Sequence, residues 1–158
     1  MKALTKANWA LKVFAWRYIP LIGFCSPRIE VMDEHRLQVS IPHTWRTKNH
    51  LGSVYFGALA IGADLAGAFL VFQKAKRRGI NANFAFKDVQ GEFLMRPEAR
   101  VHFTSQDGAI IDEMLDDSIN SGQRVNRPVS VLVTCPALHG DKPMAIFKLT
   151  LSVKARAR

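Results

Sequence analysis

Strict alternation of apolar and polar residues predicts β-strands in three parts of the chain. Residues 28–41 have the pattern of a hairpin, because Leu37, Val39 and Ile41 alternate with polar residues after a polar turn. Two further strands close the chain, with apolar positions at Val129, Val131, Val133 and Cys135 and at Phe147, Leu149, Leu151 and Val153. Between these parts, one or two strands broken near Gly91 and Pro97 are predicted from Phe84, Phe86, Phe93, Met95, Val101 and Phe103.

Helical spacing predicts two amphipathic helices. The first precedes Pro20 and has its apolar residues at Leu4, Trp9, Leu11, Val13, Phe14, Trp16 and Tyr18, among the basic residues Lys2, Lys6, Lys12 and Arg17. The second lies between a candidate cap, Asp107, and Gly122. With the strands, the order is helix, hairpin, long apolar segment, and antiparallel strands with a small helix inserted. This order indicates an α+β fold.

The long apolar segment, residues 54–72, contains a single charged residue, Asp64. Its length is close to the roughly 20 residues that cross a bilayer. Its strongly apolar residues favour insertion by about 3 to 5 kcal/mol, and one central Asp costs about 2.5 to 3.5 kcal/mol, so insertion is marginal. Basic residues also flank both ends. Since the amphipathic strands need a helix to cover them, we predict a buried core helix, with a membrane span as the alternative.

At 100° per residue, Asp64 shares its face of this helix mainly with small residues: Gly57, Ala60, Ile61, Gly67, Ala68 and Val71. Leu59, Leu65, Phe69 and Leu70 are predicted to point elsewhere. Small residues leave a groove for a ligand or let a second backbone approach closely. No residue three or four positions from Asp64 can pair with it. A ligand-binding role and pairing with a distant donor are both open at this point.

Composition narrows the class of protein. The 158 residues suit a single domain, which we divide into a helical extension over 1–27 and a core over 28–155. The net charge of +9 favours anionic partners, but no recognition helix or aromatic-interleaved basic motif indicates nucleic-acid binding. Cys25 and Cys135 form no CxxC motif, which favours a reducing, cytoplasmic location.

Other motifs are informative by their absence from the sequence. The five histidines have no metal-binding spacing, and no Walker or Rossmann glycine pattern occurs, so we expect neither a metal nor a cofactor. The first helix lacks a signal-peptide cleavage site. We expect it to pack on the domain with its lysines in solvent, and the alternative is peripheral contact with a membrane through tryptophan and lysine.

The stretch "NHLGSVYFGALAIGAD", residues 49–64, resembles the hotdog-fold thioesterase superfamily, particularly its small bacterial members near the phenylacetyl-CoA thioesterases and related branches of unknown function. In that superfamily a curved antiparallel sheet wraps a long central helix. Two protomers form a dimer with acyl-thioester sites between them, and a dimer of dimers is the alternative assembly. The resemblance implies an acyl-CoA or acyl-carrier-protein thioester hydrolase that needs no cofactor.

Residue by residue, Asn49 matches the upstream Asn of that motif, Gly57 its second Gly and Asp64 its acidic residue. The resemblance implies that Asp64 activates water or acts as nucleophile, and that the amide near Gly57 polarises the thioester carbonyl. It implies that Asn49 positions the water or the carbonyl. Tyr55 replaces the common His and Phe56 the first Gly. These two changes favour the alternative function, a non-catalytic dimer that binds acyl-CoA or lipid.

Three more residues complete the expected substrate site. Ser53 lacks the G-x-S-x-G context of a nucleophile and is predicted to cap the long helix instead. Arg77 and Arg78 belong to the basic segment "KAKRRG", which, like "KARAR" at the C-terminus, could complement a helix dipole or promote solubility. The other interpretation is that such residues bind the phosphates of coenzyme A or an acidic carrier protein.

Overall fold

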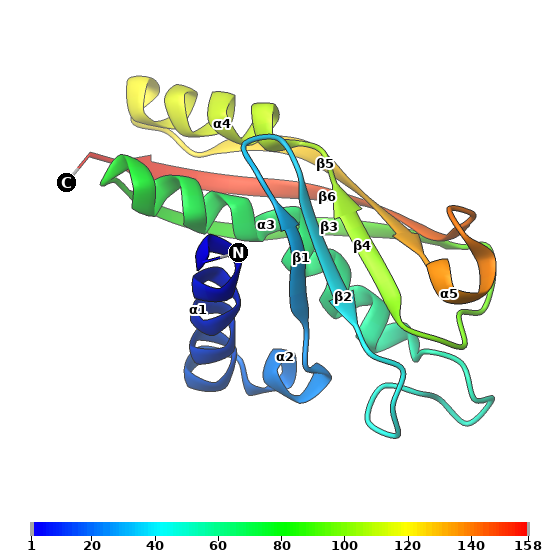
Figure 1. Ribbon diagram of the computed structural model, residues 1–158. Helices are drawn as coiled ribbons and strands as arrows, with labels where there is room; N and C mark the ends of the chain where they lie inside the picture. Colours follow the sequence, from blue (N-terminus) through cyan, green and yellow to red (C-terminus); the bar gives the residue numbers. More distant parts are fainter. Residues whose placement is uncertain (1, 158) are drawn as a thin grey trace.

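The computed structural model describes residues 2–157, with side chains from Leu4 onward; Met1 and Arg158, the last residue of the C-terminal basic segment, lie outside them. The fold is α+β, with one six-stranded antiparallel sheet in the order β1-β2-β4-β5-β6-β3 (Figure 1). The strands are β1 (Arg28–Met32), β2 (Leu37–Ile41), β3 (Asn81–Phe93), β4 (Val101–Ser105), β5 (Val125–Thr134) and β6 (Pro143–Arg156). The helices are α1 (Lys2–Tyr18), α2 (Pro20–Cys25), α3 (Phe56–Arg78), α4 (Gly108–Ser121) and α5 (Pro136–His139).

Helix α3 is the core helix that the sequence predicts. By length and composition it could cross a membrane, but 61% of its apolar 18-residue window is buried inside the protein. A Cβ atom on Gly62 would lie 2.2 Å from the ring of Phe103 in β4, so this position requires glycine. The missing side chain lets α3 approach the sheet closely, and Phe103 is itself fully buried.

The N-terminal extension is fastened to the sheet by a side chain. Asn8 of α1 accepts a hydrogen bond from the Ile29 amide at 2.8 Å and donates one to the Ile29 carbonyl at 2.9 Å. It thereby satisfies both backbone groups of a residue on the edge strand β1. Leu11 and Ala15, at 2% and 1% exposure, add α1 to the main hydrophobic core.

The structure corrects three local predictions. Strand β3 continues through Gly91, which pairs with Phe147, so the predicted break at that glycine is wrong; the irregularity is a shift in register between Phe86 and Val89. The short helix α2 begins at Pro20, where only a helix end was predicted. Asp107 holds the N-cap position of α4, but its carboxylate accepts a hydrogen bond from Ser130 instead of capping the helix.

Candidate functional site

Asp64 lies in the first half of α3 and is half-buried. Its carboxylate has no hydrogen bond or ion pair with any residue in the described part of the chain. Burial raises the pKa of this carboxyl above its ordinary value, because a desolvated carboxylate is less stable than the protonated acid. A half-buried acid without a partner is an expensive feature to retain in a core helix, and it therefore marks a candidate site.

A cavity of about 190 Å³ lies beside Asp64, between α3, the strand β3 and the corner that joins α1 to α2. Asp64 is the one charged residue among the described residues that line it. The apolar lining includes Ala68 of the predicted small-residue stripe and also Leu65 and Phe69, which the helical count wrongly placed elsewhere. The cavity is therefore more apolar and more aromatic than the sequence predicted.

Aromatic rings close this cavity on the side of α1. The ring of Phe72 lies 5.9 Å from that of Phe14 and 5.9 Å from that of Phe69. All three residues line the cavity, as do Phe84 and Phe86 of β3. The contribution of Phe14 could not be predicted, since nothing in the sequence shows which face of α1 meets α3.

The N-terminus of α3 carries no side-chain cap. Tyr55 occupies the N-cap position and makes no capping hydrogen bond, so the first amides of the helix, including that of Gly57, are available as donors. The prediction that Ser53 caps this helix is wrong. Ser53 is buried, and its hydroxyl pairs with the side chain of Asn49 instead.

Asn49 shapes the loop before α3. Its side-chain oxygen accepts hydrogen bonds from the amides of Leu51 at 2.9 Å and Ser53 at 3.2 Å, and its amide group donates to the Ser53 hydroxyl at 3.1 Å. The structure thus brings Asn49 and Ser53 together, and these contacts give Asn49 a structural role. Its predicted contact with a substrate or water stays a prediction.

Tyr55 and Phe56 form an exposed aromatic patch at the start of α3. The Tyr55 ring covers Gly57 so closely that a Cβ atom there would lie 2.5 Å from Tyr55 Cε1. Phe56 packs edge-on against Phe93 of β3, with ring centroids 6.0 Å apart. Because seven residues of α-helix rise about 10 Å, Gly57 and Asp64 of one chain lie well apart along α3.

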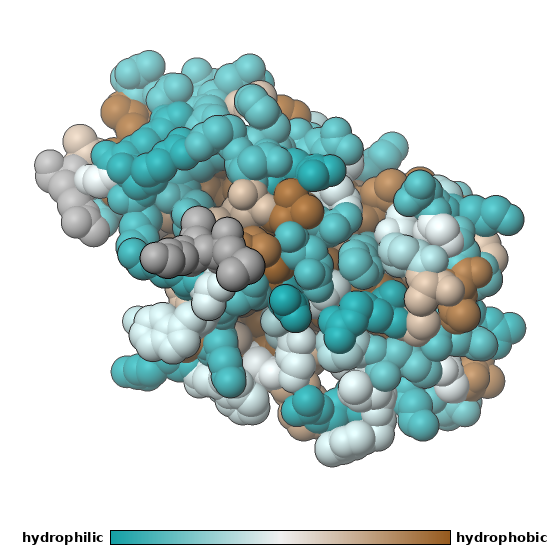
Figure 2. Space-filling model, viewed as in Figure 1, coloured by the Kyte–Doolittle hydropathy of each residue, from teal (hydrophilic) through white to brown (hydrophobic). Residues whose placement is uncertain are grey.

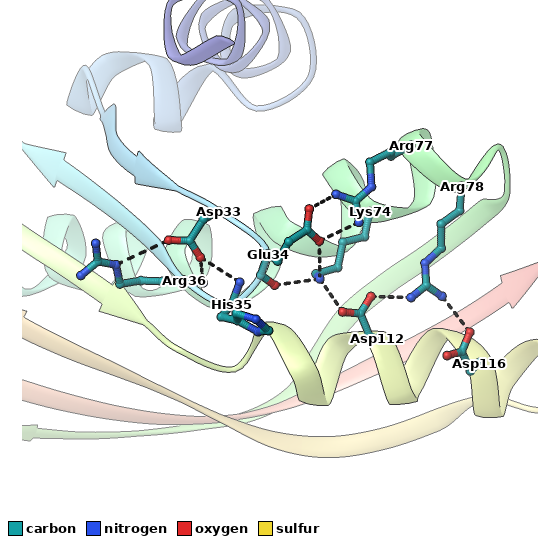
Figure 3. A network of polar contacts seen from close by, with 9 residues as sticks. All are labelled: Asp33, Glu34, His35, Arg36, Lys74, Arg77, Arg78, Asp112 and Asp116. Carbon is teal, nitrogen blue, oxygen red and sulfur yellow. Dashed lines mark hydrogen bonds and ion pairs between the residues drawn. The ribbon is translucent and has the colours of Figure 1, made fainter. Parts of the chain in front are cut away.

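Arg77 and Arg78 belong to a network of ion pairs at the other end of α3 (Figure 3). Arg77 pairs with Glu34 in the turn between β1 and β2 and lowers the pKa of that carboxyl. Arg78 pairs with Asp112 and, at 2.7 Å, with Asp116, both on α4. Both guanidinium groups are therefore occupied by carboxylates of the same chain.

The sequence analysis missed Lys74, the centre of this network. Lys74 is only 2% exposed, and its ammonium donates to the Glu34 carbonyl at 2.9 Å and to Asp112 at 2.6 Å. The acidic residues of α4, within "DEMLDD", were the available signal, since the basic end of α3 needs such partners. Within residues 2–157, no group of three or more His, Cys, Asp or Glu residues could hold a metal ion.

The comparison with protein families decides where the chain belongs. The model of a domain of unknown function, DUF4442, matches residues 7–110, which is about two thirds of the chain. The chain belongs to the DUF4442 family. The matched region holds α1 from residue 7 onward, the loop of Asn49, all of α3 and the cavity beside Asp64. No curated protein matches this DUF4442 chain in sequence.

Solved structures share the fold of this DUF4442 protein at low sequence identity. A protein of unknown function from Chlorobaculum tepidum is 16% identical with a TM-score of 0.81, covering 96% of both chains. A Pseudomonas aeruginosa protein described as a probable thioesterase is 17% identical with a TM-score of 0.76, covering 94% of this chain and 95% of its own. A thioesterase from Haemophilus influenzae is 13% identical with a TM-score of 0.67, covering 95% and 89%. The predicted α+β hotdog fold is confirmed.

Proposed function

We propose that this DUF4442 protein hydrolyses acyl thioesters of coenzyme A or of an acyl carrier protein. The observation that carries the proposal is the unpartnered carboxylate of Asp64, with its raised pKa, in the wall of an apolar cavity. The names of the Pseudomonas and Haemophilus relatives, which share the fold, add support from outside the chain. A carboxylate with a raised pKa in an apolar site is suited to accept a proton or to attack a carbonyl.

The chemistry needs a base or nucleophile and a donor for the carbonyl oxygen. As a base, Asp64 takes a proton from water, the water oxygen bonds to the thioester carbon, and the carbon–sulfur bond breaks. The leaving thiolate then accepts the proton, which gives a free acid and a thiol. As a nucleophile, Asp64 bonds to the carbonyl carbon and displaces the thiolate, which gives a mixed anhydride. Water then cleaves the anhydride, regenerates the carboxylate and supplies the proton that the thiolate takes up. In both routes the Gly57 amide stabilises negative charge on the carbonyl oxygen.

One chain cannot place both groups on the same thioester. Gly57 and Asp64 are about 10 Å apart along α3, whereas reacting atoms must approach to about 3 Å. A second copy of the chain that contributes one of the two groups resolves this mismatch. We therefore propose a homodimer with sites between the protomers. Further pairing into a dimer of dimers is open to test. Strand β3 is an edge strand with exposed Val89 and Phe93, which is suited to pair with such a copy.

The cavity indicates the substrate class. Its 190 Å³ is below the range of pockets for drug-sized ligands, so we propose a short acyl chain or a single aromatic ring as the bound group.

Recognition of the carrier through Arg77 and Arg78 requires phosphate to displace the carboxylates that now pair with them. Buried, free Cys25 and Cys135 are compatible with a reducing compartment, and we propose a cytoplasmic location.

A second candidate is a dimer that binds acyl-CoA or lipid without turnover. Tyr55 favours it, because its ring covers Gly57 at the end of the helix where the carbonyl oxygen would bind. Hydrolysis then requires the Tyr55 side chain to change rotamer, whereas binding in the cavity does not.

Thiol release from a panel of acyl-CoAs separates the two functions. Wild-type protein and Asp64→Asn are compared, with the shift in melting temperature on adding each thioester as the measure of binding. Turnover by the wild type that the variant loses while it still binds supports hydrolysis. Binding by both proteins with no thiol release from either supports the binding dimer.

A further inference from the structure

The outward face of α1 is apolar, which is the reverse of an ordinary surface helix. The inward face of α1 packs on the rest of the protein through Leu11 and Ala15, which are buried in the core. On the opposite side of the helix, Trp9 is 68% exposed, Val13 45% and Trp16 53%. At 100° per residue these three positions fall within about 60° of one another, so they form one continuous stripe.

Positive charge flanks this stripe on both sides. Residues 1–29 contain five basic residues and no acidic one. By the helical count, Lys6 and Arg17 border the stripe on one side and Lys12 borders it on the other. Among the described residues neither Lys6 nor Lys12 has an ion pair. The combination of tryptophan and lysine on one face of a helix is typical of helices that lie at a membrane surface.

The stripe continues onto α2 and the loop before α3. The Trp16 ring lies across Gly23, where a Cβ atom would come within 2.9 Å of it. Leu21 is 63% exposed, and Phe24 packs edge-on against Trp45, which is 76% exposed. Pale, weakly polar side chains lie among teal, hydrophilic ones at the lower left of Figure 2, over α1 and α2. We call this surface the N-terminal aromatic face: Trp9, Val13, Trp16, Leu21, Phe24 and Trp45.

Helix α4 is a useful contrast within the same molecule. Its outward positions include the exposed acids Glu113, Asp116 and Asp117, and its region at the top of Figure 2 is mostly polar. The α4 acids are paired with Arg78 and Arg127, so the charge on that surface is compensated. The N-terminal segment holds only bases, and its net positive charge attracts an anionic surface.

We propose that the N-terminal aromatic face binds the surface of an anionic lipid bilayer, with α1 lying in the plane of the headgroups. Tryptophan side chains enter the interfacial region, and Lys6, Lys12 and Arg17 contact lipid phosphates. Phe14, on another face of α1, lines the cavity beside Asp64, so this helix lies between the bilayer and the cavity. The proposal does not depend on hydrolysis, because the six residues of the N-terminal aromatic face do not line the cavity beside Asp64.

Tryptophan fluorescence tests this proposal directly, because all three tryptophans of the chain belong to the face. The full chain is mixed with vesicles of phosphatidylcholine alone and with vesicles of phosphatidylcholine and phosphatidylserine in equal parts, and bound protein is measured by flotation. We expect a blue shift and flotation with the anionic vesicles, weakened by salt. We expect Lys6→Gln with Lys12→Gln to lower partitioning by about thirtyfold.

Two variants test whether vesicle binding depends on the N-terminal aromatic face or on any exposed apolar residue. Trp9→Ser with Val13→Ser removes exposed groups only and should abolish flotation, whereas Leu138→Ser, at an equally exposed apolar position of α5, should leave it unchanged. Equal flotation of all variants, or no binding to anionic vesicles, would overturn the proposal. So would a loss of oligomers in Trp9→Ser with Val13→Ser, because a second copy would then be what covers the face.

Discussion

The two ends of α3 handle charge in opposite ways. In its first half, Asp64 has no partner, and burial raises the pKa of its carboxyl. At its C-terminal end, Lys74, Arg77 and Arg78 are all paired with carboxylates from β1–β2 and α4 (Figure 3). The paired end has the features of a structural network, since the charges of these three residues are compensated. The unpaired carboxylate destabilises the folded protein and has no structural role that offsets this cost. A functional role explains its presence, and this is why we assign the chemistry to Asp64.

The largest expected effect separates two aspartates by function. Asp64→Asn should lower kcat for the best acyl-CoA by about 10³-fold, because the amide is neither a base nor a nucleophile. Asp112→Asn, on the paired end, should leave kcat of the folded protein unchanged. The measurement is thiol release at saturating substrate. Equal losses in both variants would remove the functional distinction between the two ends.

The second effect is on stability. Lys74→Ala removes the buried ammonium that contacts both Asp112 and the Glu34 carbonyl, and Asp112 keeps only Arg78. The variant should lower the free energy of unfolding by about 3 kcal/mol. Asp64→Asn should not lower the free energy of unfolding, since no contact is lost. Denaturant unfolding of both variants gives the two values. A stable Lys74→Ala protein would show that the network adds little to the fold.

Cavity size gives the third prediction. Phe72→Ala enlarges the closed side of the cavity and should shift the ratio of kcat/KM between longer and shorter acyl chains about tenfold in favour of the longer ones. Phe24→Ala, an exposed phenylalanine outside the cavity, is the matched control. An unchanged preference in Phe72→Ala would place the acyl group elsewhere.

The two ends should also respond to pH with opposite signs. The pKa of Asp64 is raised by burial, so the folded protein binds this proton more tightly and loses stability as pH rises above about 4. Asp64→Asn should therefore be more stable than wild type at neutral pH and match it in acid. The Arg77 pair lowers the pKa of Glu34, so Glu34→Gln should be less stable at neutral pH and match wild type in acid. Unfolding across pH tests both signs, and two differences of the same sign would contradict the comparison.

The smallest expected effect concerns Arg77. This residue is about half exposed, and solvent screens its ion pair, so Arg77→Gln should have only a small effect on stability. KM is compared between acyl-CoA and the same acyl group on pantetheine, which lacks the nucleotide phosphates. If Arg77 has only a structural role in the ion-pair network, Arg77→Gln leaves KM unchanged for both acyl-CoA and the acyl-pantetheine. A KM that rises for acyl-CoA alone would restore the predicted phosphate contact.

The sequence predicted the elements well where one physical signal dominated. The alternation of Phe147 to Val153 and the length of the apolar run before Phe72 gave β6 and α3, because periodicity and burial act along the same segment. Gly91 was misjudged since a long antiparallel pairing with β6 outweighs the weak strand propensity of one glycine.

The candidate site was predictable only in part. Asp64 stood out because it is the one charge in an apolar run. Phe14 and Lys74 were missed, because their roles depend on which distant elements pack beside α3. Ser53 was assigned as a cap on its place near the helix start, but a hydrogen bond within its own loop was available from Asn49.

The central claim, that the unpartnered carboxylate of Asp64 carries the reaction, is tested most directly by kcat as a function of pH for the wild-type protein beside Asp64→Asn. We predict that wild-type kcat rises with pH through an apparent pKa above that of an ordinary aspartate, and that this rise is absent from the residual rate of Asp64→Asn. The same rise in both proteins, or a flat profile for the wild type, would contradict the assignment.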